Sequence, residues 1–335
     1  MGTDDLFGQM VIEMKRCTVG LFVVMFLSMA RPAAAQVDLS GNWASRQHED
    51  WQERGPGPDV ADYLGLPIND EARTRALSYS AIAQSLPERQ CLYYPPQYVV
   101  IGPQGLRIWS DVDPNTGAIR AWNISAAIDR GIITIWMDGR PRPPEDAAHR
   151  FSGFTTGIWE GNTLTTYTTH VKEGFLRRNG VPTSDQTTFT MYISRHGDTL
   201  TITAIIEDPV YLTEPHILNR SWQLDPTAAN LTNVPAPCVP ANELPGSKDE
   251  QSVPHYLPAK NPFINDFAKM YNIPLDAVLG GAQTMYPEYR KKLKDLYVAP
   301  AMCTRYCCGW GGGQGNPAPG LMCITGGSAN GLNNQ

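Results

Sequence analysis

The sequence is short of charge and carries none of the common nucleotide-binding motifs. Only 18% of its 335 residues are charged, and 33 acidic against 27 basic side chains give a formal net charge of −6. A nucleic-acid-binding protein normally presents a basic face, so this balance argues against a nucleic-acid partner. The chain also lacks a G-x-x-x-x-G-K phosphate loop, a G-x-G-x-x-G turn, a G-x-S-x-G turn and any internal repeat. Nucleotide-driven and serine-hydrolase chemistry therefore have no support in the sequence.

Long hydrophobic runs are also scarce, and the one that exists lies near the start of the chain. The run VGLFVVMFLSMA follows Lys15 and Arg16 and precedes the alanines at 33–35. A basic region, a short apolar core and an A-x-A site predict a secretory signal peptide over residues 1–35. The run is too short for a spanning helix, although a retained anchor is the alternative. We therefore expect a periplasmic or secreted protein with no stable membrane span after cleavage.

Cysteine is sparse, but its placement is informative. The chain has seven cysteines, and six of them follow the predicted cleavage site: Cys91, Cys238, Cys303, Cys307, Cys308 and Cys323. An even number in an oxidising compartment favours disulfides, whose pairing the sequence leaves open. The adjacent pair Cys307 and Cys308 would be awkward ligands for one tetrahedral zinc ion. No C-x-x-C-H motif for c-type haem is present, so we expect neither a metal nor another cofactor.

What the sequence does contain is a long series of strand patterns. From residue 37 to about 224, threonine, valine, isoleucine and aromatic residues form short runs between Gly, Asn, Asp and Pro. The run TLTITAIIE (199–207) alternates apolar residues with threonines, as a half-buried strand does. Turn residues at 161–162 and 197–198 predict two hairpins. A helical pattern occurs in this region only at 70–83, so we expect eight to ten antiparallel strands in a barrel or sandwich.

Two separated motifs favour the barrel. Gly41 and Trp43 stand in LSGNWAS near the start of the predicted mature chain, and Arg220 stands in NRSWQL near the end of the strand-rich region. This pair resembles the lipocalin and calycin pattern. The resemblance implies that the tryptophan lies across the closed end of a barrel and that the arginine packs over it. Such a cation–π contact is worth roughly 0.5–2 kcal/mol. An ordinary buried tryptophan in a β-sandwich is the alternative.

A longer set of segments resembles a family of exported bacterial proteins of unknown function, most of them described as hypothetical or lipocalin-like. The matching segments include LPERQC, PQYVVIGP, WMDGRP, GFTTGIWEGNTL, TTHVKEG, EDPVYLTEP, VPHYLP and GGAQTMYPEY. The resemblance runs from about Leu39 to Tyr289. It implies a mainly β, calycin- or lipocalin-like antiparallel barrel of eight to ten strands and an exported location. It implies no reaction.

The predicted organisation has four parts. A signal peptide (1–35) precedes the barrel (36–228), and a Cys/Gly-rich tail (301–335) ends the chain. Between them, residues 229–300 begin with a proline-rich connector and continue as short amphipathic helices. Two such helices cannot form a core of their own. We expect this short helical C-terminal extension to pack on the barrel wall or over one end, either as simple packing or as a lid.

One polar group suggests acid–base chemistry. His170 ends a predicted strand in TTHVKEGFLRRNG, while Asp185 begins the next one and Glu207 ends a third. Strand ends around one barrel rim could bring these side chains within hydrogen-bond distance of each other. His170 would be the base, a carboxylate would orient it, and Arg140 or Lys172 would stabilise an oxyanion. The alternative is that these residues only form turns.

Aromatic residues on the predicted strands suggest ligand binding. The candidate ligand-binding residues are Trp109, Trp122, Trp136, Arg140, Tyr167, Lys172 and Tyr192. A barrel lined with aromatic side chains can hold an apolar molecule. The sequence therefore favours an exported protein that binds a small hydrophobic or amphipathic molecule in its lumen. The alternatives are an enzyme of hydrolase, isomerase or cyclase type on the same barrel, and an envelope interaction module with a filled lumen and an exposed apolar patch.

Overall fold

The computed structural model describes residues 37–46, 58–79, 95–101, 105–126, 131–177, 179–227, 256–257 and 259–296. Several predictions concern residues outside these ranges. They are the signal peptide, the proline-rich part of the connector (229–255), the tail (301–335) and the six cysteines that follow the predicted cleavage site. These therefore stay predictions.

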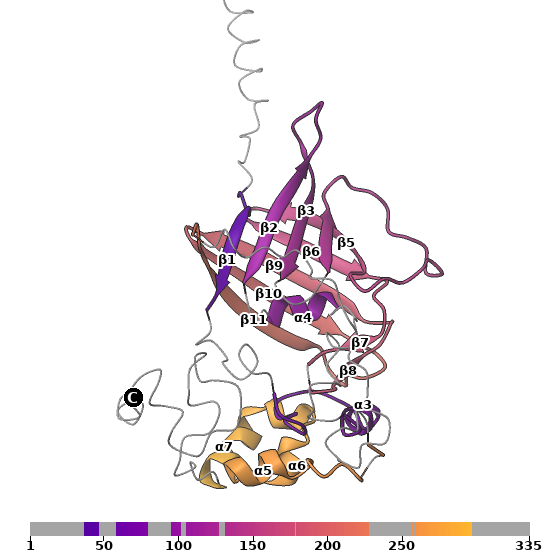
Figure 1. Ribbon diagram of the computed structural model, residues 1–335, viewed down its shortest axis with the longest axis vertical. Coiled ribbons are helices and arrows are strands. Elements are labelled where there is room, and N and C mark those ends of the chain that lie inside the picture. Colours follow the sequence, from indigo (N-terminus) through magenta and orange to yellow (C-terminus); the bar gives the residue numbers. More distant parts are fainter. Residues whose placement is uncertain are drawn as a thin grey trace, which may run out of the picture. The chain divides into compact units, whose positions relative to one another are not determined.

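Within the described residues, nine strands close into a barrel, in the order β1-β11-β10-β9-β6-β5-β4-β3-β2 (Figure 1). The strands are β1 (Gly41–Ser45), β2 (Leu106–Val112), β3 (Ile119–Ala126), β4 (Ile132–Trp136), β5 (Phe154–Glu160), β6 (Thr163–Thr169), β9 (Thr188–His196), β10 (Thr199–Glu207) and β11 (His216–Leu224). Two short strands, β7 (Gly174–Phe175) and β8 (Pro182–Thr183), pair with each other. The prediction of a mainly β fold with a closed barrel is confirmed.

The prediction that all strands are antiparallel is wrong for one pair. β4 and β5 run parallel, with Ile135 opposite Thr155 and Trp136 opposite Thr156. The connection between them, residues 137–153, returns the chain to the end of the barrel where β4 began. A parallel pair needs such a long crossover, whereas an antiparallel pair can be joined by a tight turn. The barrel is therefore mixed.

The strands have the side-chain alternation that the sequence predicted. On β10, Leu200, Ile202, Ala204 and Ile206 are buried and face the interior, while the intervening threonines are half-buried on the outer face. β6 alternates in the same way. Because successive side chains of a strand point to opposite faces, this pattern sets which face of each strand becomes the inside of the barrel.

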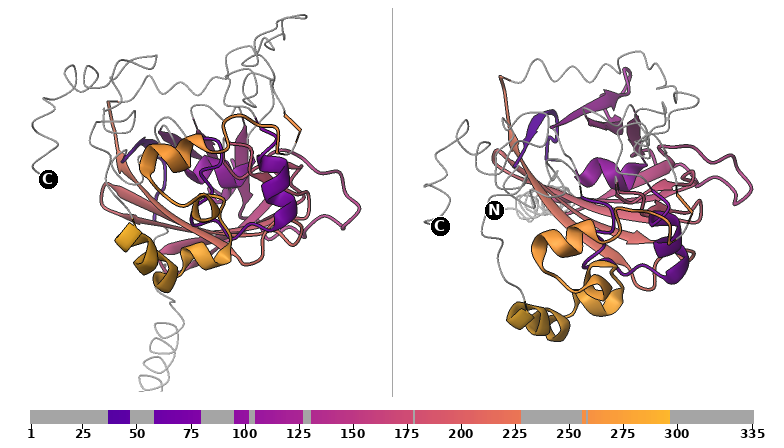
Figure 2. Two further views of the ribbon diagram at one scale, coloured as in Figure 1. Left: turned by 90° about the horizontal axis from the view of Figure 1, so that it is seen from below. Right: turned by 60° about the horizontal axis from the view of Figure 1, so that its bottom comes forward.

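A helix lies inside the barrel where the sequence analysis expected strands. Helix α4 (Pro96–Ile101) packs against β10 and β11 and is surrounded by strands in Figure 2. Its residues Gln97 to Val100 are all at most 3% exposed. A helix that is buried on every side has no polar face and therefore no 3.6-residue pattern. Short apolar runs of this kind cannot be told from strands by periodicity.

One end of the barrel is covered by residues 58–79, which we call the inner cap. It contains helix α3 (Asp70–Ala76). The inner cap binds the loop between β10 and β11, since the Asn69 amide donates to the Tyr211 carbonyl at 3.0 Å and the Thr213 amide to the Pro67 carbonyl at 2.8 Å. Asn69 also caps α3, because its side chain accepts a hydrogen bond from the amide of Ala72.

The C-terminal helices pack on the inner cap. They are α5 (Asp266–Tyr271), α6 (Leu275–Val278), the 3₁₀-helix η4 (Ala282–Met285) and α7 (Pro287–Leu296). The Tyr63 amide donates to the Val278 carbonyl at 2.8 Å, and the Gly281 amide donates to the Leu66 carbonyl at 2.8 Å. These hydrogen bonds join the C-terminal helices to the inner cap.

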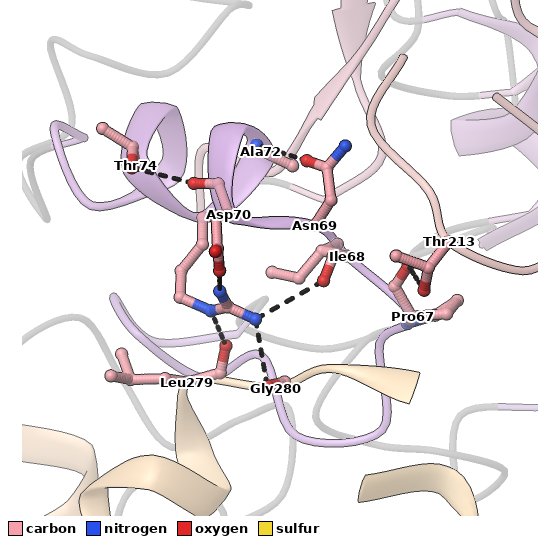
Figure 3. A network of polar contacts seen from close by, with 10 residues as sticks. Pro67, Ile68, Asn69, Asp70, Ala72, Thr74, Thr213, Leu279 and Gly280 are labelled. Atoms are coloured by element: carbon pink, nitrogen blue, oxygen red, sulfur yellow. Dashed lines mark hydrogen bonds and ion pairs between the residues drawn. The ribbon is translucent and has the colours of Figure 1, made fainter. Parts of the chain in front are cut away.

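The side chain of Arg73 joins the two layers of the cap. Figure 3 shows its partners Ile68 and Asp70 in the inner cap and Leu279 and Gly280 in the C-terminal segment. Its Nε donates to the carbonyl of Leu279 at 3.0 Å, and one terminal nitrogen donates to the carbonyl of Gly280 at 3.2 Å. The same nitrogen reaches the carbonyl of Ile68 at 3.4 Å, and Asp70 pairs with the guanidinium. Arg73 therefore holds α3 against the chain between α6 and η4.

Replacing Arg73 by alanine should release the C-terminal helices from the inner cap. Three backbone carbonyls would lose a charged donor, so we expect the free energy of unfolding to fall by about 2–3 kcal/mol. Hydrogen exchange should show lower protection across 261–285. Lys291→Ala, an exposed position on α7, is the control and should change neither quantity. Unchanged exchange in the Arg73 variant would contradict the role assigned to Arg73.

Candidate functional site

The inward-facing side chains of the barrel are closely packed. Phe189, Met191, Ile193, Leu200 and Ile202 are each at most 1% exposed. Three inward tryptophans, Trp43, Trp122 and Trp222, are equally buried. Side chains therefore fill the part of the interior that these residues line. Two hollows of several hundred Å³ lie at the capped end.

One of these hollows, which we call the rim pocket, has a volume of about 360 Å³. It lies between the end of the inner cap and the β7–β8 pair. Tyr79, Phe175 and Pro182 form its apolar walls, and the Tyr79 and Phe175 rings meet edge to face at 6.2 Å. Arg75, Ser78, Glu173, Gly174 and Gly180 complete the lining.

Glycine at position 180 is required for the shape of the rim pocket. Gly180 has a φ of +91°, a left-handed conformation that L side chains rarely adopt. A Cβ at this position would also lie 2.4 Å from the Cβ of Tyr79. Only glycine therefore allows the chain after β7 to pass this close to Tyr79 and to enclose the pocket on that side.

An ion pair lies at the edge of the rim pocket. Arg75 pairs with Glu173, and its guanidinium also bonds to the Tyr211 hydroxyl and lies 5.3 Å from the centre of the Tyr211 ring. About half of each charged side chain is exposed, so solvent screens the pair and it adds little to stability. Its effect is to place one positive and one negative group beside the aromatic walls.

A second, larger hollow lies along the junction between α3 and the α6–η4 segment. It measures about 620 Å³ but is shallow and open. Its polar groups are largely bound to one another: Arg73 bonds to backbone carbonyls, and the Tyr286 hydroxyl donates to both oxygens of Glu214 at 2.5 and 2.6 Å. That hydrogen bond raises the pKa of Tyr286. The cleft is therefore the seam between the cap layers, and the rim pocket is the better candidate for a ligand.

The residues predicted for acid–base chemistry lie near the same end but do not bind one another. The Nε2 atom of His170 lies 2.8 Å from the Pro144 carbonyl oxygen, and its Nδ1 lies 2.8 Å from the Thr169 hydroxyl. Asp185 is exposed, and the exposed Glu207 accepts a 3.4 Å hydrogen bond from Thr188. Among the described residues, no hydrogen bond or ion pair joins His170, Asp185 and Glu207. The acid–base hypothesis stays a prediction without geometric support.

Two buried polar residues near this end, Asp208 and His216, were not among the predicted site residues. Asp208 is 3% exposed and His216 is 7% exposed. Asp208 precedes Pro209, an arrangement common in turns, and this gave no sign that its carboxylate accepts several hydrogen bonds. His216 begins β11 and faces inward, where only the closed barrel buries it. Both positions depend on tertiary contacts.

The aromatic residues predicted to line the lumen are divided between the two faces of the barrel. Trp122 faces inward, and its Nε1 atom has no hydrogen-bond partner among the described residues. The alternation of the strands places Trp109, Trp136, Tyr167 and Tyr192 on the outer face. The two predicted cations stack on outer rings: Arg140 lies 3.4 Å from the centre of Trp136, and Lys172 lies 5.1 Å from Phe151.

Trp43 is buried on β1, and its Nε1 donates to the Leu39 carbonyl at 3.1 Å. The guanidinium of Arg195, on β9, lies 5.1 Å from the centre of the Trp43 ring. Arg220 is 7% exposed on β11 and donates to the carbonyl of Asn219. Gly41 has a φ of +147°, a backbone conformation that L side chains rarely adopt, so glycine suits this position at the start of β1.

No protein-family model, no curated protein and no solved structure matches this chain. In the part of the chain that the structure describes, no group of three or more His, Cys, Asp or Glu could hold a metal ion. No helix among the same residues has the length and apolar character needed to cross a bilayer.

Proposed function

We propose that the protein binds a small amphipathic molecule in the rim pocket. The observation that carries this proposal is the composition of that pocket, in which aromatic walls stand beside an ion pair. A volume of about 360 Å³ suits a ligand of modest size, because small-molecule sites commonly measure roughly 300–1,000 Å³. The close packing of the inward side chains supports a ligand at the capped end of the barrel over one in its centre.

The pocket favours a molecule with an apolar ring or short chain and a polar head. Tyr79 and Phe175 offer ring surfaces for the apolar part. Arg75 and Glu173 pair with each other, but both are about half exposed, so a ligand carboxylate can replace Glu173 on Arg75 and leave Glu173 to accept a hydrogen bond from a ligand hydroxyl or amine. The predicted export of the chain is consistent with capture of a solute outside the cytoplasm.

Native mass spectrometry of Gln36–Gln335, purified from the periplasm, tests this proposal. The panel consists of small aromatic and alkyl carboxylic acids. We expect at least one of them to bind the protein. Phe175→Ala removes one aromatic wall and should weaken binding roughly tenfold or more, since a buried aromatic side chain contributes about 1.5–3 kcal/mol.

Phe151→Ala is the matched control, because Phe151 is half-buried and lies outside the rim pocket. It should leave binding unchanged. Absence of any bound acid, or equal loss of binding in both phenylalanine variants, would count against the rim pocket as the ligand site.

A further inference from the structure

The outer face of β5, β6, β9, β10 and β11 carries two adjacent rows of uncharged side chains. The cross-strand register places Ile158, Thr165, Tyr192, Thr203 and Asn219 in one row and Thr156, Tyr167, Thr190, Ile205 and Ile217 in the next. We call these ten residues the outer patch. Neighbouring strands lie about 4.8 Å apart, so the patch is a continuous array of hydroxyl, amide, aliphatic and aromatic groups.

Large apolar side chains of the outer patch are exposed. Ile158 and Ile217 are each 61% exposed, and Tyr192 is 38% exposed. Between them, the Asn219 amide donates to the Thr203 hydroxyl at 2.6 Å, and the Thr165 hydroxyl donates to Glu160, which lies beside the patch, at 2.6 Å. The Asn219 carbonyl oxygen and the remaining threonine hydroxyls can bond to a ligand. The patch therefore combines apolar contact surface with hydrogen-bonding groups and contains no Asp, Glu, Lys or Arg.

A single guanidinium lies over this patch. Arg142, from the β4–β5 connection, is exposed and lies 4.1 Å from the centre of the Tyr167 ring. Among the described residues it has no hydrogen-bond or ion-pair partner. The neighbouring Arg140 differs, because it bonds to both oxygens of Asp138 and lowers the pKa of that carboxyl to about 2. Among the described residues, the guanidinium of Arg142 therefore stacks on the Tyr167 ring without an acidic partner.

The backbone around Arg142 limits the positions that its guanidinium can reach. Prolines precede and follow it at 141, 143 and 144, and each proline fixes its own φ angle. On one side, Arg140 lies 3.4 Å from the centre of the Trp136 ring; on the other, the carbonyl of Pro144 bonds to His170 Nε2. An arginine stacked on a ring keeps its planar donors free for bidentate binding of a carboxylate.

We propose that the outer patch, with Arg142 at one edge, is a binding surface for an acidic polysaccharide. Sugar rings present apolar faces to Tyr192 and Ile158 and hydroxyls to the threonines and Asn219. A carboxylate on the sugar accepts the paired hydrogen bonds of Arg142. An extended polysaccharide can contact similar side chains on each of the neighbouring strands that the patch crosses.

Other polyanions fit this surface less well. Nucleic acid carries one charge per about 1.7 Å of duplex and requires several cations, whereas the outer patch has one cation beside it. A membrane surface attracts clusters of about four to eight Lys or Arg residues, and the patch itself contains neither residue. One carboxylate of the polysaccharide pairs with Arg142, and the neighbouring sugars contact the uncharged patch through their ring faces and hydroxyl groups.

The test uses affinity electrophoresis and calorimetry of Gln36–Gln335 with polygalacturonate, neutral dextran, and vesicles containing phosphatidylglycerol. We expect binding to polygalacturonate, weaker binding to dextran and none to the vesicles. Arg142→Ala should weaken polygalacturonate binding roughly tenfold. Arg107→Ala is the matched control, since Arg107 is an exposed arginine 5.4 Å from the Trp109 ring on β2, and it should change binding less than twofold.

A second variant separates binding from folding. Tyr192→Ala removes an exposed ring and should also weaken polygalacturonate binding, while Val112→Ala, at an exposed position on β2, should not. Thermal unfolding of all four variants should match that of the unchanged protein within a few degrees. The proposal is overturned if polygalacturonate does not bind, if Arg107→Ala has the same effect as Arg142→Ala, or if only the vesicles bind in an Arg142-dependent way.

Discussion

Replacing Asp208 by alanine is expected to lower the free energy of unfolding by about 3–5 kcal/mol, the range for breaking a buried charged network. Its carboxylate accepts five hydrogen bonds, all from the two loops at the capped end of the barrel. The donors are the Ser184 amide at 2.6 Å, the Ser184 hydroxyl at 2.8 Å, the Thr187 hydroxyl at 2.9 Å, the Val210 amide at 2.9 Å and the Tyr211 amide at 3.1 Å.

The large effect follows from the burial of these donors. Ser184, Thr187 and Asp208 are all at most 5% exposed, so donors that lose the carboxylate do not regain water. Each unsatisfied buried group costs about 1–3 kcal/mol. Asp208→Asn should cost less, because an amide oxygen still accepts some of these bonds while its NH₂ group opposes the others.

Urea denaturation measures the change, and Asp185→Ala is the matched control. Asp185 stands in the same loop as Ser184 and Thr187, but it is exposed. We expect its replacement to change stability by less than about 0.5 kcal/mol, as at most surface positions. Equal stability of the Asp208 and Asp185 alanine variants would show that the hydrogen-bond hub is not formed in solution.

The second large effect is a loss of stability in mild acid that depends on His216. Burial, together with the nearby positive charges of Arg177 and Arg220, lowers the pKa of this inward-facing histidine to about 3. In the unfolded chain the pKa of histidine is about 6.5. Between these two values the unfolded state binds a proton that the folded state does not bind, so the folded state loses stability as the pH falls.

The expected size follows from the unfolded pKa. At pH 5 the protonation of His216 in the unfolded state should cost about 2 kcal/mol relative to pH 7. Urea denaturation of the unchanged protein should show this loss in addition to any loss caused by other groups. His216→Gln cannot take up the proton, so its stability should fall by about 2 kcal/mol less over the same pH interval.

His196→Gln is the control for the pH experiment, because His196 ends β9 on an exposed position. Its stability should follow the unchanged protein between pH 7 and pH 5. If the free energy of unfolding of His216→Gln and of the unchanged protein depends on pH in the same way, His216 does not have the lowered pKa that burial inside the barrel gives it.

Only one side of the rim pocket could be predicted from the sequence. The stretch that includes His170 and Lys172 was expected at a barrel rim, and Glu173 and Phe175 from the same stretch do line the rim pocket. Their partners Arg75 and Tyr79 lie about a hundred positions earlier in the chain. No local pattern connects two such segments, because the contact exists only once the inner cap covers the barrel.

The sequence by itself determined the strand-rich character of the chain, the inner face of β10 and the two hairpin turns. The alternation in residues 199–207 and the turns at 161–162 and 197–198 act between near neighbours, so they could be read without the rest of the chain. The tertiary structure alone decided that β4 and β5 run parallel, that residues 96–101 form a helix inside the barrel, and that Tyr167 and Arg142 meet on the outside. Each of these features depends on contacts between segments that are far apart in the sequence. Such contacts form only when the barrel closes, so no local pattern predicts them.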